Sequence, residues 1–389
     1  MELYELITPC HFGLESVMKR EITDLGYEIS QVEDGKVTFT GDAQAVADAN
    51  MFLRTTERVL LKAGAFRACT FDELFEATKA LPWERYIPKD GKFWIAKANS
   101  VRSKLFSPSD IQSVMKKAIV ERLKQIYHVS WFEESGASFP IRVSIVKDIV
   151  TVGLDTTGTS LHKRGYRVQT AKAPITETLA AALIKLTPWK PDRIMVDPFC
   201  GSGTFPIEAA MIAANMAPGM KRTFLSEEWT HFLPASCWAD AREEAHDILD
   251  LGAVTHLQGY DIDKEVIDAA RANAERAGVG HLIHFQQRPV SQLSHSGKYG
   301  FLITNPPYGE RLEDRETVEN LYRTLGERFA LLDTWSMYLI SGYADTEKAI
   351  GKKAAKNRKI YNGMLKTYFY QYPGPKPLRK KEKYDTIAK

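Results

Sequence analysis

The sequence lacks the features that mark membrane-spanning, disulfide-bonded and secreted proteins. None of its apolar runs reaches the length of about 18 residues that a helix needs to cross a bilayer. Four cysteines (Cys10, Cys69, Cys200 and Cys237) are scattered and form no CxxC pair, which argues against a zinc site and against a disulfide framework. The first residues lack the basic and apolar regions of a secretory signal. We therefore expect a cytoplasmic protein with no membrane segment and no metal.

The net charge of the chain is also small, +3 at pH 7. A nucleic-acid partner therefore has to be inferred from clustering of the cations. Three clusters have aromatic neighbours or lead into a basic tail, a pattern typical of phosphate contacts combined with base stacking. They are Lys97, Arg102 and Lys104 near Trp94 and Phe106; Lys163, Arg164 and Arg167 around Tyr166; and Lys352, Lys353, Lys356, Arg358 and Lys359. The alternative for each is a solvated charged face, above all for the tail.

The chain is long enough, at 389 residues, for two or three domains. Its first part mixes short β-like runs with helical stretches such as 107–125, which predicts small α+β units with antiparallel sheets. The expected strands are 3–8, 36–40, 92–97, 141–145 and 149–154. A hinge is expected at 165–172, where this pattern changes.

Beyond the hinge, helices and strands alternate. Helices are expected at 175–186, 204–216, 239–251 and 264–277, and strands at 193–197, 256–261, 283–287 and 301–304. This order predicts a doubly wound parallel sheet, in which a ligand lies at the carboxyl ends of the strands.

A glycine-rich turn follows the first of these strands, in MVDPFCGSGTFPIEAA. Gly201 and Gly203 leave room for a ligand against bare backbone, and the amides of the next helix face it. A Walker loop is excluded because no Gly-Lys-Ser/Thr follows, and a dinucleotide fold is disfavoured because Pro206 takes the third glycine position. Asp261, in GYDID, is suited to accept from both hydroxyls of a ribose, whereas a helix N-cap role fits Asp263 better.

The stretch FLITNPPYGERL ends a strand abruptly. Residues 301–304 read as a buried strand, and Pro306 and Pro307 then remove two backbone donors and fix φ. A polar amide, two stiff residues and Tyr308 therefore project together beyond the sheet.

These motifs, in this order, resemble a known enzyme family. DPFCGSGT, GYDID and NPPYGERL look like motifs I, II and IV of class I S-adenosylmethionine-dependent methyltransferases that modify amino groups, and APITETLAAALI looks like their motif X helix. GLDTTGTSLHKRGYR resembles the exit of a THUMP RNA-binding domain. The whole chain is similar to RlmL-like guanine-N2 methyltransferases of large-subunit (23S) rRNA, which also carry the label N6-adenine-specific DNA methylase.

The resemblance implies an α/β fold in which α+β units precede a Rossmann-like catalytic domain. It places a ferredoxin-like unit at 1–60, THUMP at 61–165, a linker at 166–172 and the catalytic domain with its basic tail at 173–389. S-adenosylmethionine is the implied cofactor, with S-adenosylhomocysteine as its product. Ribosomal RNA is the implied partner, and no feature calls for a protein partner.

The resemblance also assigns site residues. The implied cofactor contacts are Pro174, Thr176, Asp197, Phe199, Cys200, Gly201, Ser202, Gly203, Thr204, Asp261, Ile262, Asp263, Gln287 and Asn305. In FQQRPV the acid of motif III is missing, and Gln287 or the adjacent backbone is expected to take its place. The implied catalytic residues are Asn305, Pro306, Pro307 and Tyr308, and the implied RNA contacts are Lys97, Arg102, Lys104, Lys163, Arg164, Arg167 and Arg311.

The chemistry expected of this motif leaves several substrates open. Asn305 Oδ1 and the Pro306 carbonyl can accept the two hydrogens of an exocyclic amine and aim its lone pair at the methyl group, while Tyr308 can stack on the base. Adenine N6, cytosine N4, guanine N2 and a glutamine amide all fit. The RNA-binding first half favours an RNA base, with guanine N2 first and adenine N6 of RNA or DNA as the alternative. A non-catalytic assembly factor is disfavoured by the intact motifs.

Overall fold

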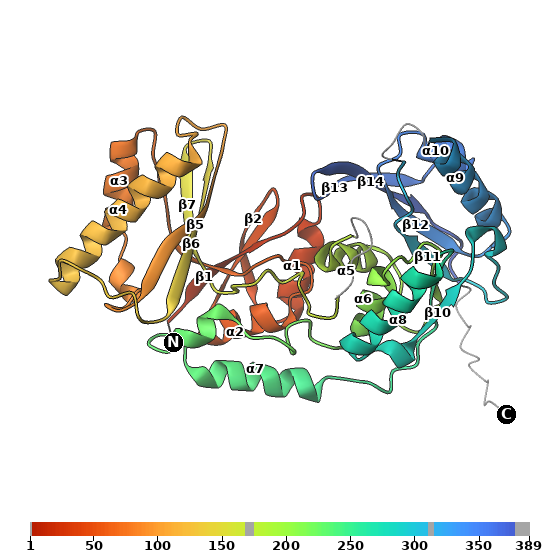
Figure 1. Cartoon of the computed structure of the whole chain (residues 1–389), viewed down its shortest axis with the longest axis horizontal. Helices are drawn as coiled ribbons and strands as arrows, with labels where there is room; N and C mark the ends of the chain where they lie inside the picture. The colour runs from red at the N-terminus through yellow and green to blue at the C-terminus, as the bar shows by residue number, and fades with distance from the viewer. Residues whose placement is uncertain (1, 168–174, 310–314, 378–389) are drawn as a thin grey trace, which may run out of the picture. The chain divides into compact units, whose positions relative to one another are not determined.

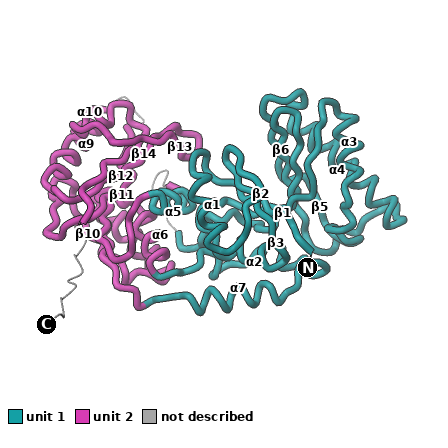
Figure 2. Tube along the Cα trace, turned by 180° about the vertical axis from the view of Figure 1, so that it is seen from behind, with its two compact units in different colours: residues 1–167, 176–186, 214–251 teal, residues 168–175, 187–213, 252–389 magenta. Residues whose placement is uncertain are grey.

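A computed structural model describes residues 2–167, 175–309 and 315–377 of the chain (Figure 1). The chain divides into two compact units (Figure 2). Unit 1 takes residues 1–167, 176–186 and 214–251, and unit 2 takes 168–175, 187–213 and 252–389. Most of the expected hinge, 168–172, lies outside the described residues.

Unit 1 is built on one seven-stranded sheet in the order β2-β3-β1-β4-β7-β6-β5. Its strands are β1 (Tyr4–Pro9), β2 (Glu28–Glu33), β3 (Lys36–Gly41), β4 (Leu60–Arg67), β5 (Lys92–Val101), β6 (Ser138–Val146) and β7 (Ile149–Asp155), which confirms the five expected strands. The expected antiparallel pairing is confirmed for all neighbouring strands except β5 and β6, but the strands form one continuous sheet. Leu6 and Ile7 of β1 pair with β4 and join the two parts, and β5 runs parallel to β6 because a long helix crosses between them.

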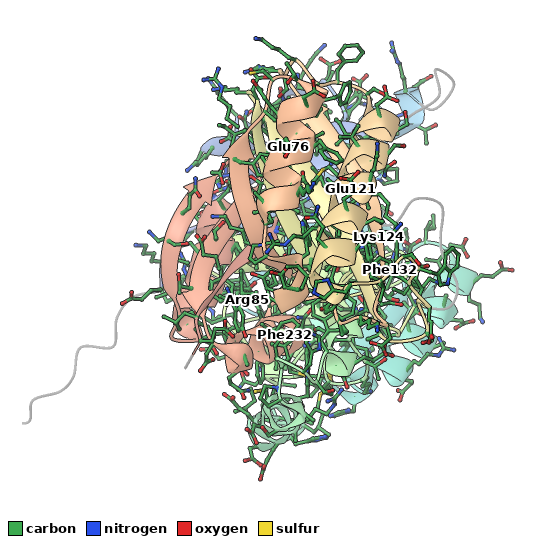
Figure 3. All side chains as sticks on the ribbon, turned by 90° about the vertical axis from the view of Figure 1, so that its left-hand side faces the viewer. Glu76, Arg85, Glu121, Lys124, Phe132 and Phe232 are labelled. Atoms are coloured by element: carbon green, nitrogen blue, oxygen red, sulfur yellow. The ribbon has the colours of Figure 1, made fainter. Side chains whose placement is uncertain are left out.

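The helices of unit 1 are α1 (Glu15–Asp24), α2 (Ala43–Phe52), α3 (Phe71–Ala80), α4 (Pro108–Tyr127), α5 (Glu177–Leu186) and α7 (Ala235–Asp247). The helix α4 begins at Pro108 after an N-cap, Ser107, whose hydroxyl accepts from the Asp110 amide. Helices α3 and α4 cover one face of β5, β6 and β7, and charged side chains such as Glu76 and Lys124 lie on their outer surface (Figure 3). The opposite face of these strands is free of those helices.

Residues 214–251 are an insertion between two elements of the unit 2 sheet, yet they pack in unit 1. Trp229 is fully buried there, and its ring stacks on Phe139 of β6 with centroids 4.9 Å apart. Phe224 stacks on Trp238 of α7 at 5.3 Å. The helix expected at 239–251 is α7, which begins earlier, at Ala235. The insertion therefore completes the apolar core of unit 1.

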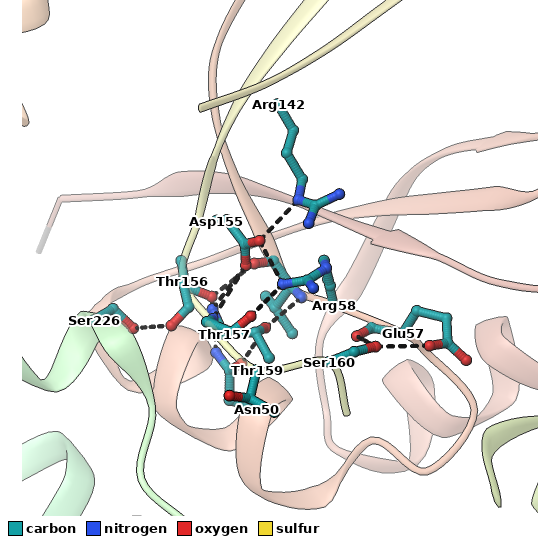
Figure 4. Close-up of polar contacts among 12 residues, drawn as sticks. Asn50, Glu57, Arg58, Arg142, Asp155, Thr156, Thr157, Thr159, Ser160 and Ser226 are labelled. Carbon is teal, nitrogen blue, oxygen red and sulfur yellow. Dashed lines mark hydrogen bonds and ion pairs between the residues drawn. The ribbon is translucent and has the colours of Figure 1, made fainter. Parts of the chain in front are cut away.

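A buried polar cluster fixes the end of β7 (Figure 4). Asp155 accepts from Arg58 Nη1 at 2.6 Å and from Arg142 Nε at 2.8 Å. Asn50 of α2 donates to the Thr156 hydroxyl at 2.9 Å, and the Ser226 hydroxyl of the insertion donates to the Thr156 carbonyl at 2.9 Å. The cluster joins α2, β6, β7 and the insertion through satisfied hydrogen bonds.

Unit 2 contains the doubly wound sheet, in the order β10-β9-β8-β11-β12-β14-β13. Its strands are β8 (Met195–Asp197), β9 (Leu257–Asp261), β10 (Ile283–Gln287), β11 (Phe301–Thr304), β12 (Ser336–Ser341), β13 (Lys356–Asn362) and β14 (Leu365–Tyr372). Strands β8 to β12 are parallel, whereas β14 is antiparallel to β12 and to β13. Its helices are α6 (Thr204–Ala213), α8 (Lys264–Ala277), α9 (Arg315–Ala330) and α10 (Thr346–Ile350). The four strands expected here are confirmed, while β12, β13, β14 and α9 were not anticipated.

Candidate active site

The parallel strands of unit 2 end together at one edge of the sheet. There β8 ends at Asp197, β9 at Asp261, β10 at Gln287 and β11 at Thr304. Gln287 is in register with Asp261, and Asp197 with Gly259. Most of the expected site residues therefore lie along one edge, as a doubly wound sheet requires of its ligand site.

The loop after Asp197 carries β8 into α6 and folds against β9. The Cys200 amide donates to the Tyr260 carbonyl at 2.8 Å. Gly201 (φ +52°) and Gly203 (φ +87°) both adopt the left-handed conformation that favours glycine. A Cβ on Gly203 would lie 3.1 Å from the Phe285 ring, whereas one on Gly201 would meet nothing within 4 Å. Tight packing and a positive φ thus both favour glycine at Gly203, while Gly201 borders open space.

Asp261 turns its carboxylate toward this loop. Its Oδ2 accepts from the Gly201 amide at 3.1 Å and its Oδ1 from the Asp263 amide at 3.1 Å, so each oxygen keeps a lone pair for a further donor. Burial raises the pKa of this carboxyl above its ordinary value. Asp263 caps α8 by accepting from the Glu265 amide at 2.8 Å, which confirms that the N-cap is Asp263 rather than Asp261.

The remaining cofactor candidates of unit 2 surround these two features. Cys200, Ser202 and Thr204 are buried and Phe199 is half-buried. The Ser202 hydroxyl is buried and has no hydrogen-bond partner among the described residues. Ile262, directly after Asp261, is 70% exposed, and Gln287 donates to its carbonyl at 3.0 Å.

Asp197 connects the ends of β8 and β11. Its carboxylate is buried and accepts from the Thr304 hydroxyl at 2.5 Å and from the Phe199 amide at 3.1 Å. Burial raises its pKa from 3.8 to about 7, although both hydrogen bonds act in the other direction. Because Thr304 precedes Asn305, this contact fixes the residue from which the Asn-Pro-Pro-Tyr stretch departs.

Asn305 and Tyr308 contact each other beyond the end of β11. The Tyr308 hydroxyl donates to Asn305 Oδ1. A Cβ on Gly342, just past β12, would lie 3.2 Å from the Tyr308 ring, so the ring lies against bare backbone. Pro306 is buried and Pro307 is exposed. The four expected catalytic residues thus form one compact group at the edge of the sheet.

The other candidates do not belong to this group. Thr176 immediately precedes α5 and is part of unit 1, while Pro174 and Arg311 lie outside the described residues. Among the expected RNA contacts, Lys97, Arg102, Lys104 and Lys163 are exposed. A β-bulge between Ile95 and Lys97 places Trp94 opposite Pro140 and Lys97 opposite Arg142, so that Trp94 and Lys97 share one face of the sheet.

Two of the expected RNA contacts are instead used inside unit 1. Arg164 is buried, and its guanidinium donates to the carbonyls of Leu161 at 2.8 Å and Arg54 at 2.5 Å. Arg167 Nε lies 3.2 Å from the buried carboxylate of Glu177 in α5. Arg164 and Arg167 are close in sequence to the exposed Lys163, and the sequence alone did not show that their side chains point into unit 1.

Two parts of the edge were missed by sequence reasoning. Thr304 lies in an apolar run that was expected to be a buried strand. A buried hydroxyl needs a hydrogen-bond partner, and this need could have indicated the contact with Asp197. Gly342 follows β12, a strand that was not anticipated. The described residues contain no group of three or more histidine, cysteine or acidic side chains that could hold a metal. Nor do they include a helix of the length and apolarity needed to span a bilayer.

Comparison with known proteins decides the family. A model of the RMKL-like methyltransferase domain matches residues 164–371, a model of the RlmL ferredoxin-like domain matches 5–60, and a THUMP model matches 68–155. The chain belongs to the RlmL-like family of THUMP-containing methyltransferases. These matches also show the Rossmann-like catalytic fold that the alternation of strands and helices predicted.

Three relatives of this family member match nearly its full length. The Bacillus subtilis (strain 168) protein named "Putative RNA methyltransferase YpsC" is 46% identical over 98% of this chain and 99% of its own. A structure described as a "predicted N6-adenine-specific DNA methylase" from Listeria monocytogenes str. 4b F2365 is 48% identical, with a TM-score of 0.90 over 96% of this chain and 97% of its own. SMU.472, whose structure is described as that of "a putative methyltransferase complexed with SAH" (S-adenosylhomocysteine), is 42% identical, with a TM-score of 0.91 over 97% of this chain and 100% of its own.

The cofactor of this family is S-adenosylmethionine, and the residues at the edge fit it. The backbone of Gly201 borders open space. Each carboxylate oxygen of Asp261 keeps a lone pair that can accept from a ribose hydroxyl. The Ser202 hydroxyl has no partner among the described residues. Ile262 offers an exposed apolar surface next to Asp261 for a flat base. These residues would hold the cofactor, which supplies an electrophilic methyl group when bound.

Proposed function

We propose that this methyltransferase modifies an exocyclic base amine of ribosomal RNA, and that the amine is guanine N2 of 23S rRNA. The observation that supports this most directly is the group Asn305-Pro306-Pro307-Tyr308 at the carboxyl end of β11, on the same edge as Gly201 and Asp261. Such a group holds an amine, whereas a hydroxyl or carbon target requires no paired acceptors.

An exocyclic amine is a weak nucleophile because its lone pair is delocalised into the ring. Asn305 Oδ1 and the Pro306 carbonyl would accept its two hydrogens, which favours a pyramidal nitrogen with its lone pair directed at the methyl group. The N–C bond forms as the bond from carbon to sulfur breaks, and the nitrogen then loses a proton to solvent. Holding the amine is therefore the contribution of these residues, and no general base is needed before attack.

Tyr308 orients the amide that holds the amine. Its hydroxyl occupies one of the two lone pairs of Asn305 Oδ1 and leaves the second for the target. Its ring is placed by contact with the backbone at Gly342 and provides a face on which an extruded base can stack. Asp197 and Thr304 fix the start of the group from the other side.

The surface that we propose for RNA binding lies on unit 1. Lys97 and Trp94 share the face of the sheet that α3 and α4 leave free, and Arg102 and Lys104 follow in the exposed loop before α4. Phe106 in the same loop is 80% exposed. Cations beside exposed rings suit phosphates and unpaired bases. Arg164 and Arg167 are left out of this surface because their guanidinium groups are buried in unit 1.

The name of the Bacillus subtilis relative, an RNA methyltransferase, supports an RNA substrate, and a ribosomal substrate would place the protein in the cytoplasm. The name of the Listeria relative supports a second candidate, adenine N6. Both targets present two amine hydrogens to the same pair of acceptors.

Nucleoside mass spectrometry separates these candidates. We expect rRNA from a strain without this protein to lack N2-methylguanosine at one or more positions, and the wild-type gene but not the Asn305→Ala variant to restore it. Loss of N6-methyladenosine instead would move the assignment to adenine, and unchanged rRNA would contradict the proposal. In vitro, S-adenosylhomocysteine should raise the melting temperature, whereas NAD should not.

A further inference from the structure

The β13–β14 hairpin of unit 2 is strongly basic. Residues 351–373 include Lys352, Lys353, Lys356, Arg358, Lys359 and Lys366 and contain no acidic residue. Sequence reasoning left most of this cluster open as a solvated face. In the structure Lys356, Arg358, Lys359 and Lys366 lie on β13 and β14, which pair with each other, and β13 is an edge strand of the sheet (Figure 1).

Lysines and tyrosines alternate on one face of this hairpin. In the antiparallel register Lys359 is opposite Tyr368, and Tyr361 is opposite Lys366, so all four side chains project to the same side. Lys359 lies over the Tyr361 ring at 5.0 Å and Lys366 over the Tyr368 ring at 5.4 Å. Lys359, by hydrogen bond and charge, and then Lys366 hold the pKa of Tyr361 below its ordinary value, which reports a positive local potential.

The tip of the hairpin carries apolar side chains into solvent. Asn362 pairs with Leu365, so Gly363 and Met364 form a two-residue turn, and Gly363 has the positive φ (+61°) that such a turn needs. Met364 is 96% exposed and Leu365 is 43% exposed. The Met364 side chain is therefore not placed there by packing within the protein.

The tip lies at the edge where β11 ends. Strand β14 is antiparallel to β12, with Tyr368 opposite Ser341, so Leu365 and Lys366 extend past the carboxyl end of β12. A Cβ on Gly342 would lie 3.2 Å from the Tyr308 ring and 3.7 Å from the Lys366 carbonyl. The hairpin and the proposed base-stacking tyrosine thus both lie close to Gly342.

We propose that this hairpin binds the substrate RNA next to the target nucleotide, an inference that rests on the proposed function. Lys359 and Lys366 contact backbone phosphates, and Tyr361 and Met364 pack against the bases that flank the extruded one. A cationic face supplies affinity for the phosphates, and an exposed apolar tip can occupy the space that an extruded base leaves.

The charge part is tested with the full-length protein and an unmodified in-vitro transcript of large-subunit rRNA. Lys359→Ala/Lys366→Ala should lower affinity about tenfold and make the slope of log affinity against log salt shallower, by about 0.7 to 0.9 for each lost phosphate contact. Lys190→Ala/Lys298→Ala is the matched control, because both lysines are exposed and precede β8 and β11 at the opposite edge of the sheet. It should leave the slope unchanged.

The tip is tested by Met364→Ser, which keeps the charge. The salt slope should stay at its wild-type value, while single-turnover methyl transfer at saturating RNA should fall about tenfold, as for loss of one stacking contact. Leu331→Ser removes an apolar side chain that is 71% exposed between α9 and β12, at the opposite edge, and should have no effect. Cofactor affinity should be unchanged in every variant.

The outcomes separate this inference from the function on which it rests. If wild-type protein neither binds nor methylates the transcript, the proposed function fails and the hairpin assignment fails with it. If wild-type protein binds and the double-lysine variant shows the same slope and affinity, the hairpin assignment alone is wrong. A slope change in the control pair equal to that of the hairpin pair would likewise overturn it.

Discussion

Unit 1 and unit 2 both bury carboxylates, but the two units give them different partners. In unit 1 Asp155 accepts from both Arg58 and Arg142. Burial alone would raise the pKa of Glu57, but hydrogen bonds from His162 and Thr178 and the charge of His162 lower it to about 2. These acids are neutralised within the unit and have little capacity left for a ligand.

The acids at the edge of unit 2 have no cation beside them in the part of the chain that the structure describes. Asp197 and Asp261 accept only from amides and a hydroxyl, and neither forms an ion pair with a described residue. Burial raises the pKa of both carboxyls. Unit 2 thus holds carboxylates whose ionised form is destabilised by burial at the edge where a ligand is expected, which is typical of functional sites. Unit 1 instead pairs its acids with cations, which stabilises the fold.

The sharpest test of this difference changes the backbone that borders the open space. Gly201→Val should abolish S-adenosylmethionine binding, because its side chain would fill the space where the ligand approaches bare backbone. Gly351→Val is the control, because Gly351 also has a positive φ and open surroundings in unit 2 but follows α10. Calorimetry should show binding by the control only. Unchanged affinity in folded Gly201→Val would show that the cofactor lies elsewhere.

The difference should also appear in the pH dependence of stability. Because the folded-state pKa of Asp197 is about 7, above its ordinary 3.8, this group favours the folded state most below about pH 4. That contribution should fall, by at most about 1.4 kcal/mol per pH unit, as the pH rises to 7. Denaturant titrations of the cofactor-free protein should show this decline relative to Asp197→Asn.

Glu57→Gln provides the opposite pattern. The folded-state pKa of Glu57 is about 2, below its ordinary 4.5, so its contribution is present above pH 4.5 and is lost as the pH falls toward 2. The two difference curves should therefore change in adjacent pH windows and with opposite sign. Curves of the same sign would contradict the contrast between the units.

A third change breaks an ion-paired acid of unit 1. Asp155→Asn leaves Arg58 and Arg142 without their shared anion and should cost about 3 kcal/mol of unfolding free energy, as for other broken buried pairs. Asp268→Asn removes an exposed acid paired with Lys264 and should leave stability unchanged. The rate of methyl transfer per folded molecule should equal wild type in both variants. A large rate loss in Asp155→Asn would mean that the cluster does more than stabilise unit 1.

The smallest effect on folding, but a clear one on rate, is expected at Asn305. Asn305→Ala should reduce single-turnover methyl transfer about a hundredfold or more, with cofactor and RNA affinity little changed, because its contact matters most as the nitrogen becomes pyramidal. Tyr308→Phe keeps the ring but removes the hydroxyl that orients Asn305, so we expect a loss of about fivefold, as for one hydrogen bond. Wild-type rates in Asn305→Ala would show that the amine is held by other residues.

Much of unit 2 could be predicted from the sequence because its signals are local. The strands at 193–197, 256–261, 283–287 and 301–304 were visible as short segments that alternate with helical segments, and this alternation predicted their parallel order. The convergence of Asp197, Asp261 and Asn305 at one edge then follows from the topology. Strand β13 was missed because its exposed lysines conceal the alternation that marks a strand, whereas β14, LKTYFYQY, has the threonine and aromatic residues typical of strands and was not singled out.

Long-range packing could not be predicted in the same way. Trp229 is of a residue type that is often buried, but nothing in the insertion indicates that its partner is Phe139 of β6 in unit 1 rather than a residue of unit 2. Arg164 has the same neighbours in sequence as exposed Lys163, and only the carbonyls of Leu161 and Arg54 fix it inward. These outcomes depend on contacts between residues far apart in the chain.

Because of the insertion, unit 1 cannot finish folding when its first stretch of sequence has been synthesised. Unit 1 is assembled from three stretches of sequence, and the last of them ends at Leu251. A ribosome adding about 5 to 20 residues per second needs roughly 4 to 17 seconds to proceed from Arg167 to that point. Until then the nascent chain presents the surface that Trp229 and Trp238 will cover, so this portion of the protein is exposed to chaperones and to premature association before it can close.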